Sequence, residues 1–218
     1  MRASSAGSSR RPVTPPDGGR GPEVAFGDSA SVLKLFSTEP LTASVWRRSL
    51  PTDLVEAAAT WRHGPAFRRV VPVDDRRPAS AIQSILESDG EAMPVAIARD
   101  LAQLLALHAV LVPDVARRLR VERIVDDGCR RFHADHVGSR MLCTYAGPGT
   151  ECLPASAVDA RRPADGSDDH VLDPDAVWRC EPGWVLLMRG TTGSGPAQFH
   201  RSPPVDVSGP RLLVAIDA

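Results

Sequence analysis

Residues 131–154 read RFHADHVGSRMLCTYAGPGTECLP, and residues 199–217 read FHRSPPVDVSGPRLLVAID. The first stretch places His133 two residues before Asp135, and the second contains His200. Residues two apart in an extended strand point to the same face, so we expect the first two side chains to share one cavity. Two imidazoles and one carboxylate suit a mononuclear iron ion that keeps open positions. The two stretches therefore predict a metal site.

The order of these residues along the chain supports a metal site more strongly than the H-x-D triplet does. In a chain with 6 histidines, such a triplet occurs by chance about half of the time. His200 follows Asp135 by 65 residues and Arg211 follows by 11 more, each in a candidate strand. By the same alternation of faces, His136 should point away from the cavity. Context and order therefore support the site, whereas the triplet alone does not.

The composition indicates one folded domain and excludes some partners. With 218 residues, 42% of them hydrophobic, the chain can bury one sizeable core. A formal net charge of −1 provides no general attraction to nucleic acid or to an anionic membrane, so we expect neither as a partner. No apolar run is long enough to cross a bilayer, and 4 cysteines without a C-x-x-C pair indicate reduced thiols. We expect a cytoplasmic protein.

The first half of the chain is predicted to be mainly helical. Residues 1–28 are rich in Ser, Gly, Pro and Arg, which predicts a disordered tail before a single domain over residues 29–218. Within that domain, residues 29–116 should form a helical buttress. Apolar residues at helical spacing predict helices over 51–62, 80–88 and 94–108, and short apolar runs predict strands over 31–36 and 43–46.

The second half of the chain is predicted to be the β core. Short apolar stretches separated by turn residues predict six strands, over residues 118–125, 129–135, 139–146, 184–189, 197–201 and 211–217. One or two irregular strands could be added around residues 150–153 and 170–178. Residues 158–175 are polar and rich in turn formers, which predicts a long loop. Many short strands after a set of helices predict an α+β protein with a sandwich or barrel in residues 117–218.

These residues resemble the iron- and 2-oxoglutarate-dependent dioxygenases, whose double-stranded β-helix (jelly-roll) carries an H-x-D, a distal His and an Arg beyond it. The resemblance implies Fe(II) and 2-oxoglutarate as cofactors and a small-molecule or protein substrate that is not specified. It assigns the metal ligands as His133, Asp135 and His200, and the cofactor-binding residues as Arg211, Tyr145 and Arg140. Arginine suits the far carboxylate of 2-oxoglutarate because its planar fork bonds both oxygens.

A closer resemblance is to an uncharacterised bacterial family of unknown function. The phrases of that family are FHxDxxxxRxLCTYxGPGTEWLP and HRSPP, followed by a short strand that begins with Arg and ends with Ile-Asp. This chain has FHADHVGSRMLCTYAGPGTECLP, HRSPP and RLLVAID. The resemblance covers the C-terminal half and implies no particular substrate.

Other interpretations of the same residues remain open. Glu151 could be a fourth ligand in a cupin-like metal-binding protein without oxygenase activity, linked to metal homeostasis. Cys129 and Cys143 could join His133 and His136 in a zinc site, although the spacings match no usual structural zinc pattern. Cys143 could also be the nucleophile of a hydrolase, and the domain could be a β-rich interaction module without a metal.

Overall fold

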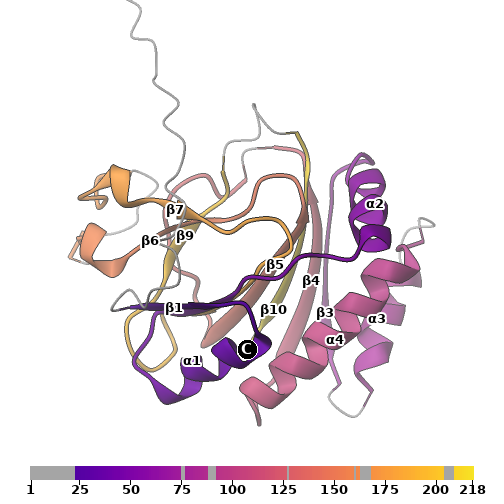
Figure 1. Cartoon of the computed structure of the whole chain (residues 1–218), viewed down its shortest axis with the longest axis horizontal. Helices are drawn as coiled ribbons and strands as arrows, with labels where there is room; N and C mark the ends of the chain where they lie inside the picture. Colours follow the sequence, from indigo (N-terminus) through magenta and orange to yellow (C-terminus); the bar gives the residue numbers. More distant parts are fainter. Residues whose placement is uncertain are drawn as a thin grey trace, which may run out of the picture.

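A seven-stranded sheet forms the centre of the molecule (Figure 1). The structure is a computed structural model that describes residues 23–74, 77–87, 92–126, 128–159, 161–162, 168–203 and 209–218. In spatial order the strands are β1 (Val24–Gly27), β2 (Ala43–Trp46), β8 (Val185–Arg189), β5 (Ser139–Ala146), β10 (Arg211–Asp217), β4 (Arg117–Ile124) and β3 (Phe67–Val73). β1 and β2 are parallel, and the other neighbours are antiparallel.

Helices cover one face of this sheet (Figure 1). The α-helices are α1 (Leu35–Thr38), α2 (Thr52–Trp61), α3 (Pro78–Glu87) and α4 (Val95–Leu111), and the short 3₁₀ helices are η1 (Ala30–Lys34), η2 (Ala155–Ala157) and η3 (Pro174–Ala176). Ile97, Leu101 and Leu104 recur at helical spacing along α4 and are buried against the strands. None of the helices among the described residues has the length and apolarity to span a membrane.

A smaller sheet lies against the opposite face of the large one. It contains β7 (Trp178–Arg179), β6 (Glu151–Leu153) and β9 (Phe199–Arg201), in that order. One apolar cluster joins the sheets, because Cys152 and Trp178 from the small sheet pack with Leu142 and Leu213 from the large one. Two sheets around a common core, with helices outside, form a double-stranded β-helix in an α+β protein, which confirms the predicted fold class.

The central strands are buried on both faces and therefore have two sets of neighbours. Along β5 every residue is buried, and successive side chains alternate between the layers. Met141, Cys143 and Tyr145 belong to the core beneath the helices. Leu142 belongs to the core between the two sheets, so Arg140 and Thr144 point to that side as well. The same alternation decides which residues can reach the site.

Most predicted elements are present, and some predictions are wrong. All three predicted α-helices exist, as do the predicted strands that correspond to β2, β4, β5, β8, β9 and β10. The predicted strand over residues 31–36 is helical, because the side chain of Ser29 caps η1 and Leu33 and Phe36 both pack into the core beneath the helices. Residues 129–135 form no strand beyond a single bridge at His133. β3 was not predicted at all.

The predicted domain boundaries also need correction. The tail was expected to reach residue 28, but Val24–Gly27 forms β1, which pairs with β2 in parallel. The side chain of Val24 packs into the core between the two sheets. Residues 1–22 of the predicted tail lie outside the described residues. Residues 29–116 contribute β2 and β3 to the sheet in addition to their helices, so this half is part of the same sheet.

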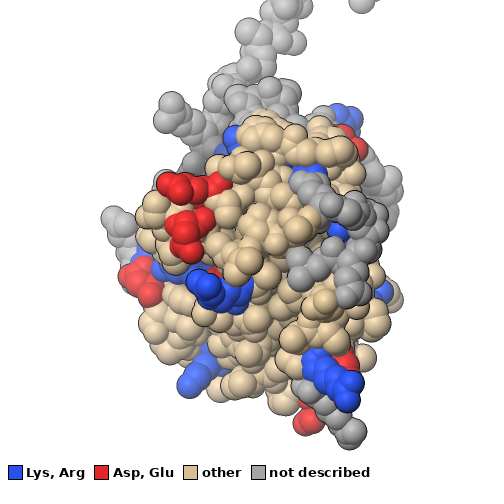
Figure 2. All heavy atoms as spheres, turned by 90° about the vertical axis from the view of Figure 1, so that its right-hand side faces the viewer, with Lys and Arg blue, Asp and Glu red and all other residues tan. Residues whose placement is uncertain are grey.

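On the helical side, shown in Figure 2, acidic and basic side chains of the described residues lie in small separate groups.

Candidate metal centre

Backbone pairing brings the two predicted histidine ligands together. The N–H of His133 donates to the carbonyl of His200 at 3.0 Å, and the N–H of His200 donates to the carbonyl of His133 at 2.9 Å. This is an antiparallel bridge, in which directly opposed residues place their side chains on the same face. The ring centroids are 4.6 Å apart. Two residues that lie 67 positions apart in the chain thus become neighbours.

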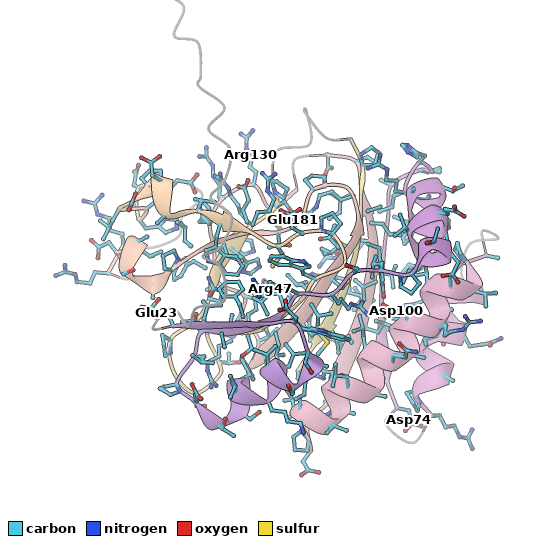
Figure 3. The ribbon with its side chains drawn as sticks, viewed as in Figure 1. Glu23, Arg47, Asp74, Asp100, Arg130 and Glu181 are labelled. Atoms are coloured by element: carbon cyan, nitrogen blue, oxygen red, sulfur yellow. The ribbon has the colours of Figure 1, made fainter. Side chains whose placement is uncertain are left out.

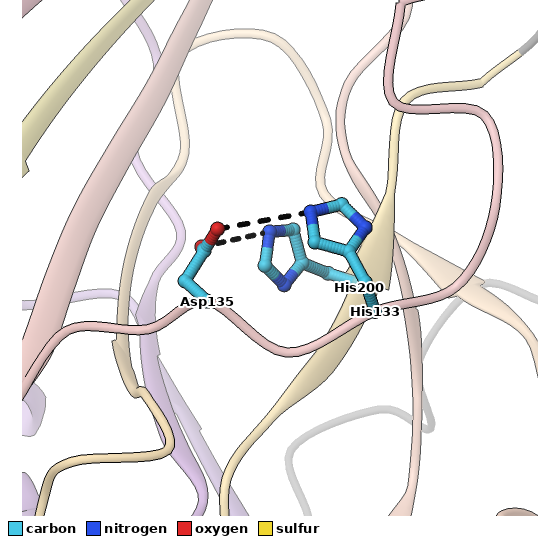
Figure 4. Close-up of side chains that lie close together, drawn as sticks. All are labelled: His133, Asp135 and His200. Carbon is cyan, nitrogen blue, oxygen red and sulfur yellow. Dashed lines mark ion pairs between the residues drawn. The ribbon is translucent and has the colours of Figure 1, made fainter. Parts of the chain in front are cut away.

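Asp135 completes the group from the loop that follows His133 (Figure 4). One carboxylate oxygen lies 3.7 Å from Nε2 of His133, and the other lies 3.1 Å from Nε2 of His200. The loop is held by the N–H of Thr191, which donates to the carbonyl of Asp135 at 2.8 Å. Gly190 permits this close approach, since a Cβ there would lie 2.7 Å from the same carbonyl oxygen.

Both imidazoles are oriented by backbone carbonyls. Nδ1 of His133 contacts the carbonyl of Arg131 at 2.9 Å, and Nδ1 of His200 contacts the carbonyl of Gln198 at 3.3 Å. A carbonyl oxygen only accepts, so Nδ1 carries the proton in each ring, and in a neutral ring Nε2 keeps its lone pair. Metal-binding histidines have this arrangement, in which the second nitrogen fixes the tautomer. Both Nε2 atoms face Asp135.

Arg140 links Asp135 to a second buried carboxylate. Its Nη1 lies 2.5 Å from Oδ2 of Asp135, while Nε and Nη2 donate to the two oxygens of Asp217 at 2.6 and 2.9 Å. Burial alone would raise the pKa of Asp135, but the contact with His200 and the charge of Arg140 outweigh it and hold this pKa below its usual range. Asp135 is therefore a carboxylate at neutral pH.

The donor set fits a metal ion. The candidate ligand atoms of His133, Asp135 and His200 lie within 4.8 Å of one another. Neighbouring ligands at about 2.1 Å from an ion are about 3 Å apart, so the side chains must close by small rotations to bind it. Burial, followed by the charge of His200, lowers the pKa of His133, which favours the neutral form that binds metal. Oδ2 of Asp135 is buried, yet none of its close contacts has the alignment of a hydrogen bond.

Arg211 lies in the same cavity, surrounded by hydroxyl groups. The cavity has a volume of about 630 Å³, and its walls include the three candidate ligands and Arg211. The guanidinium donates to the hydroxyls of Ser202 at 2.9 Å, Thr150 at 3.2 Å and Thr144 at 3.3 Å. Burial lowers the pKa of Arg211 to about 10. No carboxylate among the described residues pairs with this guanidinium, and its Nε has no hydrogen-bond partner there.

Tyr145, which we expected to contact a co-substrate, lies outside the cavity. Its side chain lies on the helical face of β5, and its hydroxyl donates to Oδ2 of Asp100 at 2.6 Å. Asp100, labelled in Figure 3, lies on α4 and also forms an ion pair with Arg48 at 2.7 Å. Arg140 does line the cavity, but both edges of its guanidinium are used by Asp135 and Asp217. Its part in binding a co-substrate stays a prediction, and the contacts favour support of Asp135.

Three of the four alternative ligands lie away from the centre, whereas Cys129 lines the cavity but is not part of the converging group of ligand atoms. Glu151 pairs with Arg179 and with Arg201, the latter at 2.7 Å, and it is not among the residues that line the cavity. Cys143 faces the helices, where burial raises the pKa of its thiol to about 12, which suits neither zinc binding nor a nucleophile. Nδ1 of His136 contacts the hydroxyl of Thr191 at 3.1 Å, away from the three ligands, as predicted.

Three residues of the site were not predicted from the sequence. Ser202 and Thr150 contact Arg211, and Asp217 holds Arg140. The position of Ser202, two residues after His200, and that of Asp217, six residues after Arg211, place each on the same face as its predecessor in an extended chain. Alternation along the strands could have identified both, whereas Thr150 follows a Gly-Pro-Gly turn and gave no such signal.

Comparisons with known structures give distant matches, among them a hydroxylase and a dioxygenase. A prolyl-4-hydroxylase from Pseudomonas putida is 15% identical with a TM-score of 0.47, over 86% of this chain and 96% of that one. A bsmA homologue from Methylobium petroleophilum is 14% identical with a TM-score of 0.46, over 86% and 91%. The Fe(II)/α-ketoglutarate-dependent dioxygenase TqaL is 14% identical with a TM-score of 0.44, over 78% and 75%.

No curated protein matches this sequence significantly. A family model does match, over residues 27–217, and its description is "Protein of unknown function (DUF1826)". The match includes every strand of both sheets except the first residues of β1, together with the three candidate ligands and Arg211. The chain belongs to the DUF1826 family.

Proposed function

We propose that this protein is a mononuclear non-haem iron, 2-oxoglutarate-dependent oxygenase. The observation that carries the proposal is the convergence of His133, Asp135 and His200 in a cavity that also contains Arg211. The three ligands suit an ion with open coordination positions, and the buried arginine suits a carboxylate. Neither feature alone distinguishes an oxygenase from another metal protein. Together in one cavity, they suit a keto diacid, whose keto-acid end can bind the ion while its other carboxylate pairs with the arginine.

His133, Asp135 and His200 would hold the iron, and iron with bound 2-oxoglutarate would supply oxidising chemistry from dioxygen. The carbonyl of Arg131 contacts Nδ1 of His133, and the carbonyl of Gln198 contacts Nδ1 of His200. These contacts fix the tautomer of each ring, so that each Nε2 is available to bind the ion. Arg140, after His200, helps to lower the pKa of Asp135, and it restrains the carboxylate. These contacts preorganise the ligands before the ion arrives.

The surroundings of Arg211 are suited to a distal carboxylate. Each of the three neighbouring hydroxyls accepts a hydrogen bond from the guanidinium, so each keeps its own proton to donate to an anion. Burial makes a charge-assisted bond here stronger than it would be in water. The guanidinium and the hydroxyls together could therefore hold both oxygens of one carboxylate.

Metal content is the first test. Protein purified without a histidine tag and loaded anaerobically with Fe(II) should contain one iron per chain by elemental analysis. His133→Ala, Asp135→Asn and His200→Ala should each reduce the iron content severalfold at a fixed metal concentration. His136→Ala is the matched control, because this neighbouring histidine contacts Thr191 and should leave the iron content unchanged. Equal iron content in all four variants would show that the ligands are elsewhere.

Binding of 2-oxoglutarate is the second test. The Fe(II) protein should develop a visible charge-transfer band when 2-oxoglutarate is added without oxygen. Arg211→Gln should weaken this binding by about tenfold to a hundredfold, as expected for the loss of hydrogen bonds from a charged group. Arg118→Gln is the control, since Arg118 lies on β4 outside the cavity. Iron binding without 2-oxoglutarate binding would instead favour a metal-binding protein without oxygenase chemistry.

A further inference from the structure

The cavity contains a further arginine, largely but not fully buried, that the proposed function does not use. Arg120 lies on β4 and faces the same cavity as the metal ligands, with a side-chain exposure of 12%. Its strand neighbour in β10 is Ala215, which in turn faces Leu142 in β5. The small side chain of Ala215 leaves space above the sheet for the guanidinium. Burial, and then the positive charge of nearby Arg140, lowers the pKa of Arg120.

The charge around Arg120 is not balanced within the described part of the chain. One oxygen of Glu122 serves two arginines, at 3.2 Å from Nε of Arg120 and 3.0 Å from Nε of Arg68. Asp217, the other nearby carboxylate, is engaged on both oxygens by Arg140. Nε of Arg120 is buried and makes no well-aligned hydrogen bond to a described residue. Two guanidinium groups sharing one carboxylate leave one positive charge uncompensated.

The cavity as a whole shows the same excess. Six arginines line it, namely Arg68, Arg120, Arg123, Arg140, Arg201 and Arg211. Arg140 pairs with Asp135 and Asp217, and Arg201 pairs with Glu151. Arg68 and Arg120 share Glu122, and Arg211 forms no ion pair with a described carboxylate. A buried charge without a partner is costly, so such an excess is typical of a site completed by an anionic ligand. A cavity of about 630 Å³ also has the size of sites that hold a drug-sized ligand.

Arg120 and Arg211 lie at different positions along the sheet. Arg211 pairs in register with Ile124, four residues beyond Arg120 on β4, which corresponds to roughly 13 Å along the strand. Arg120 lies nearer to the row of Arg140 and Asp217 that supports the metal ligand. If Arg211 holds the distal carboxylate of 2-oxoglutarate, a different anion is needed to neutralise Arg120.

We propose that Arg120, assisted by Arg68, binds an anionic group of the substrate, so that the substrate is an acidic molecule carrying a carboxylate or a phosphate. This inference rests on the proposed function, because it takes the cavity to hold the substrate beside the co-substrate. Arg120 supplies the buried charge, and Arg68, whose side chain is 65% exposed, lies at the solvent side of the pair. Glu122 keeps the two guanidinium groups apart and oriented.

The test uses inorganic phosphate and acetate as probes. Protein loaded with Mn(II) and saturated with 2-oxoglutarate should increase the ³¹P relaxation rate of phosphate or the ¹³C relaxation rate of acetate, since the paramagnetic ion lies in the same cavity. Whichever probe binds more tightly identifies the anion class. Arg120→Gln should weaken that binding by about tenfold or more and change 2-oxoglutarate affinity by less than about twofold. Arg118→Gln, on the same strand but outside the cavity, should behave as wild type.

Three outcomes overturn the inference: neither probe binds to the wild-type protein, Arg120→Gln binds the probe as wild type does, or Arg120→Gln loses only 2-oxoglutarate affinity. Arg120→Lys, which keeps the charge, serves if the Gln variant does not fold, and it should retain part of the binding. If the wild type binds no metal or no 2-oxoglutarate, the proposed function fails by itself. Calorimetric titration of the metal-free protein with the same probes then still decides whether Arg120 binds an anion.

Discussion

The ion pairs of Arg140 allow a quantitative test of how the site is held. Its side chain is 9% exposed, and its partners Asp217 and Asp135 are 7% and 13% exposed. Arg140→Gln leaves two buried carboxylates without their cationic partner, and breaking a buried ion pair costs about 3–5 kcal/mol. We therefore expect the free energy of unfolding of the metal-free protein to fall by about that amount, measured by urea denaturation.

A double-mutant cycle separates this electrostatic effect from a loss of packing. Asp217→Asn alone removes one carboxylate partner of Arg140. The double variant Arg140→Gln with Asp217→Asn removes both charges of that ion pair, so neither is left unpaired. The double variant should be about 2–3 kcal/mol more stable than the sum of the single losses predicts. Additive losses, or a loss below about 1 kcal/mol in Arg140→Gln, would refute the reasoning. Arg140→Lys should remain destabilised, because one ammonium cannot reproduce three directed contacts.

Three further predictions follow from the layers of the fold. Tyr145→Phe should destabilise the protein by about 1–2 kcal/mol through the lost bond to Asp100 and leave metal and 2-oxoglutarate binding unchanged; weaker binding of either would contradict its placement. At pH 8 the raised pKa of Cys143 keeps its thiolate scarce, so mass spectrometry after iodoacetamide treatment should find exposed Cys129 alkylated first, and equal rates would disagree. Gly190→Ala places a Cβ 2.2 Å from a backbone oxygen of the ligand-bearing loop and should reduce iron content, and unchanged content would count against that loop geometry.

The elements with strong periodic patterns could be predicted from the sequence, and those without could not. α4 repeats apolar residues on one face, and β5 and β10 are mostly apolar because both of their faces are covered. β3 reads FRRVVPV, in which Arg68 and Pro72 are exposed, since it is an edge strand with one covered face. Residues 31–36 look like a strand by composition, but the cap at Ser29 makes them helical. Local signals of this kind outweigh apolar content.

The site shows the same division between local and distant information. Residue type and spacing indicated His133, Asp135, His200 and Arg211, because each belongs to a short motif. Tyr145 was assigned by its distance from Asp135 in sequence, although two residues separated by an odd number of positions within β5, such as Tyr145 and Arg140, must face opposite layers. The alternation that argued for His133 with Asp135 should have excluded Tyr145 once Arg140 was placed inside.

The pairing of His133 with His200 is the step that no local pattern could supply. Asp135 does not continue a strand from His133, so its approach to the imidazoles depends on the loop contacts with Gly190 and Thr191 and on Arg140, not on strand alternation. Those contacts come from two separate parts of the chain, and neither has a sequence signature that relates it to a metal ligand. Substitutions at Gly190 and Arg140 therefore test the construction of the centre more directly than substitutions of the ligands, because they leave every donor atom in place and change only what positions it.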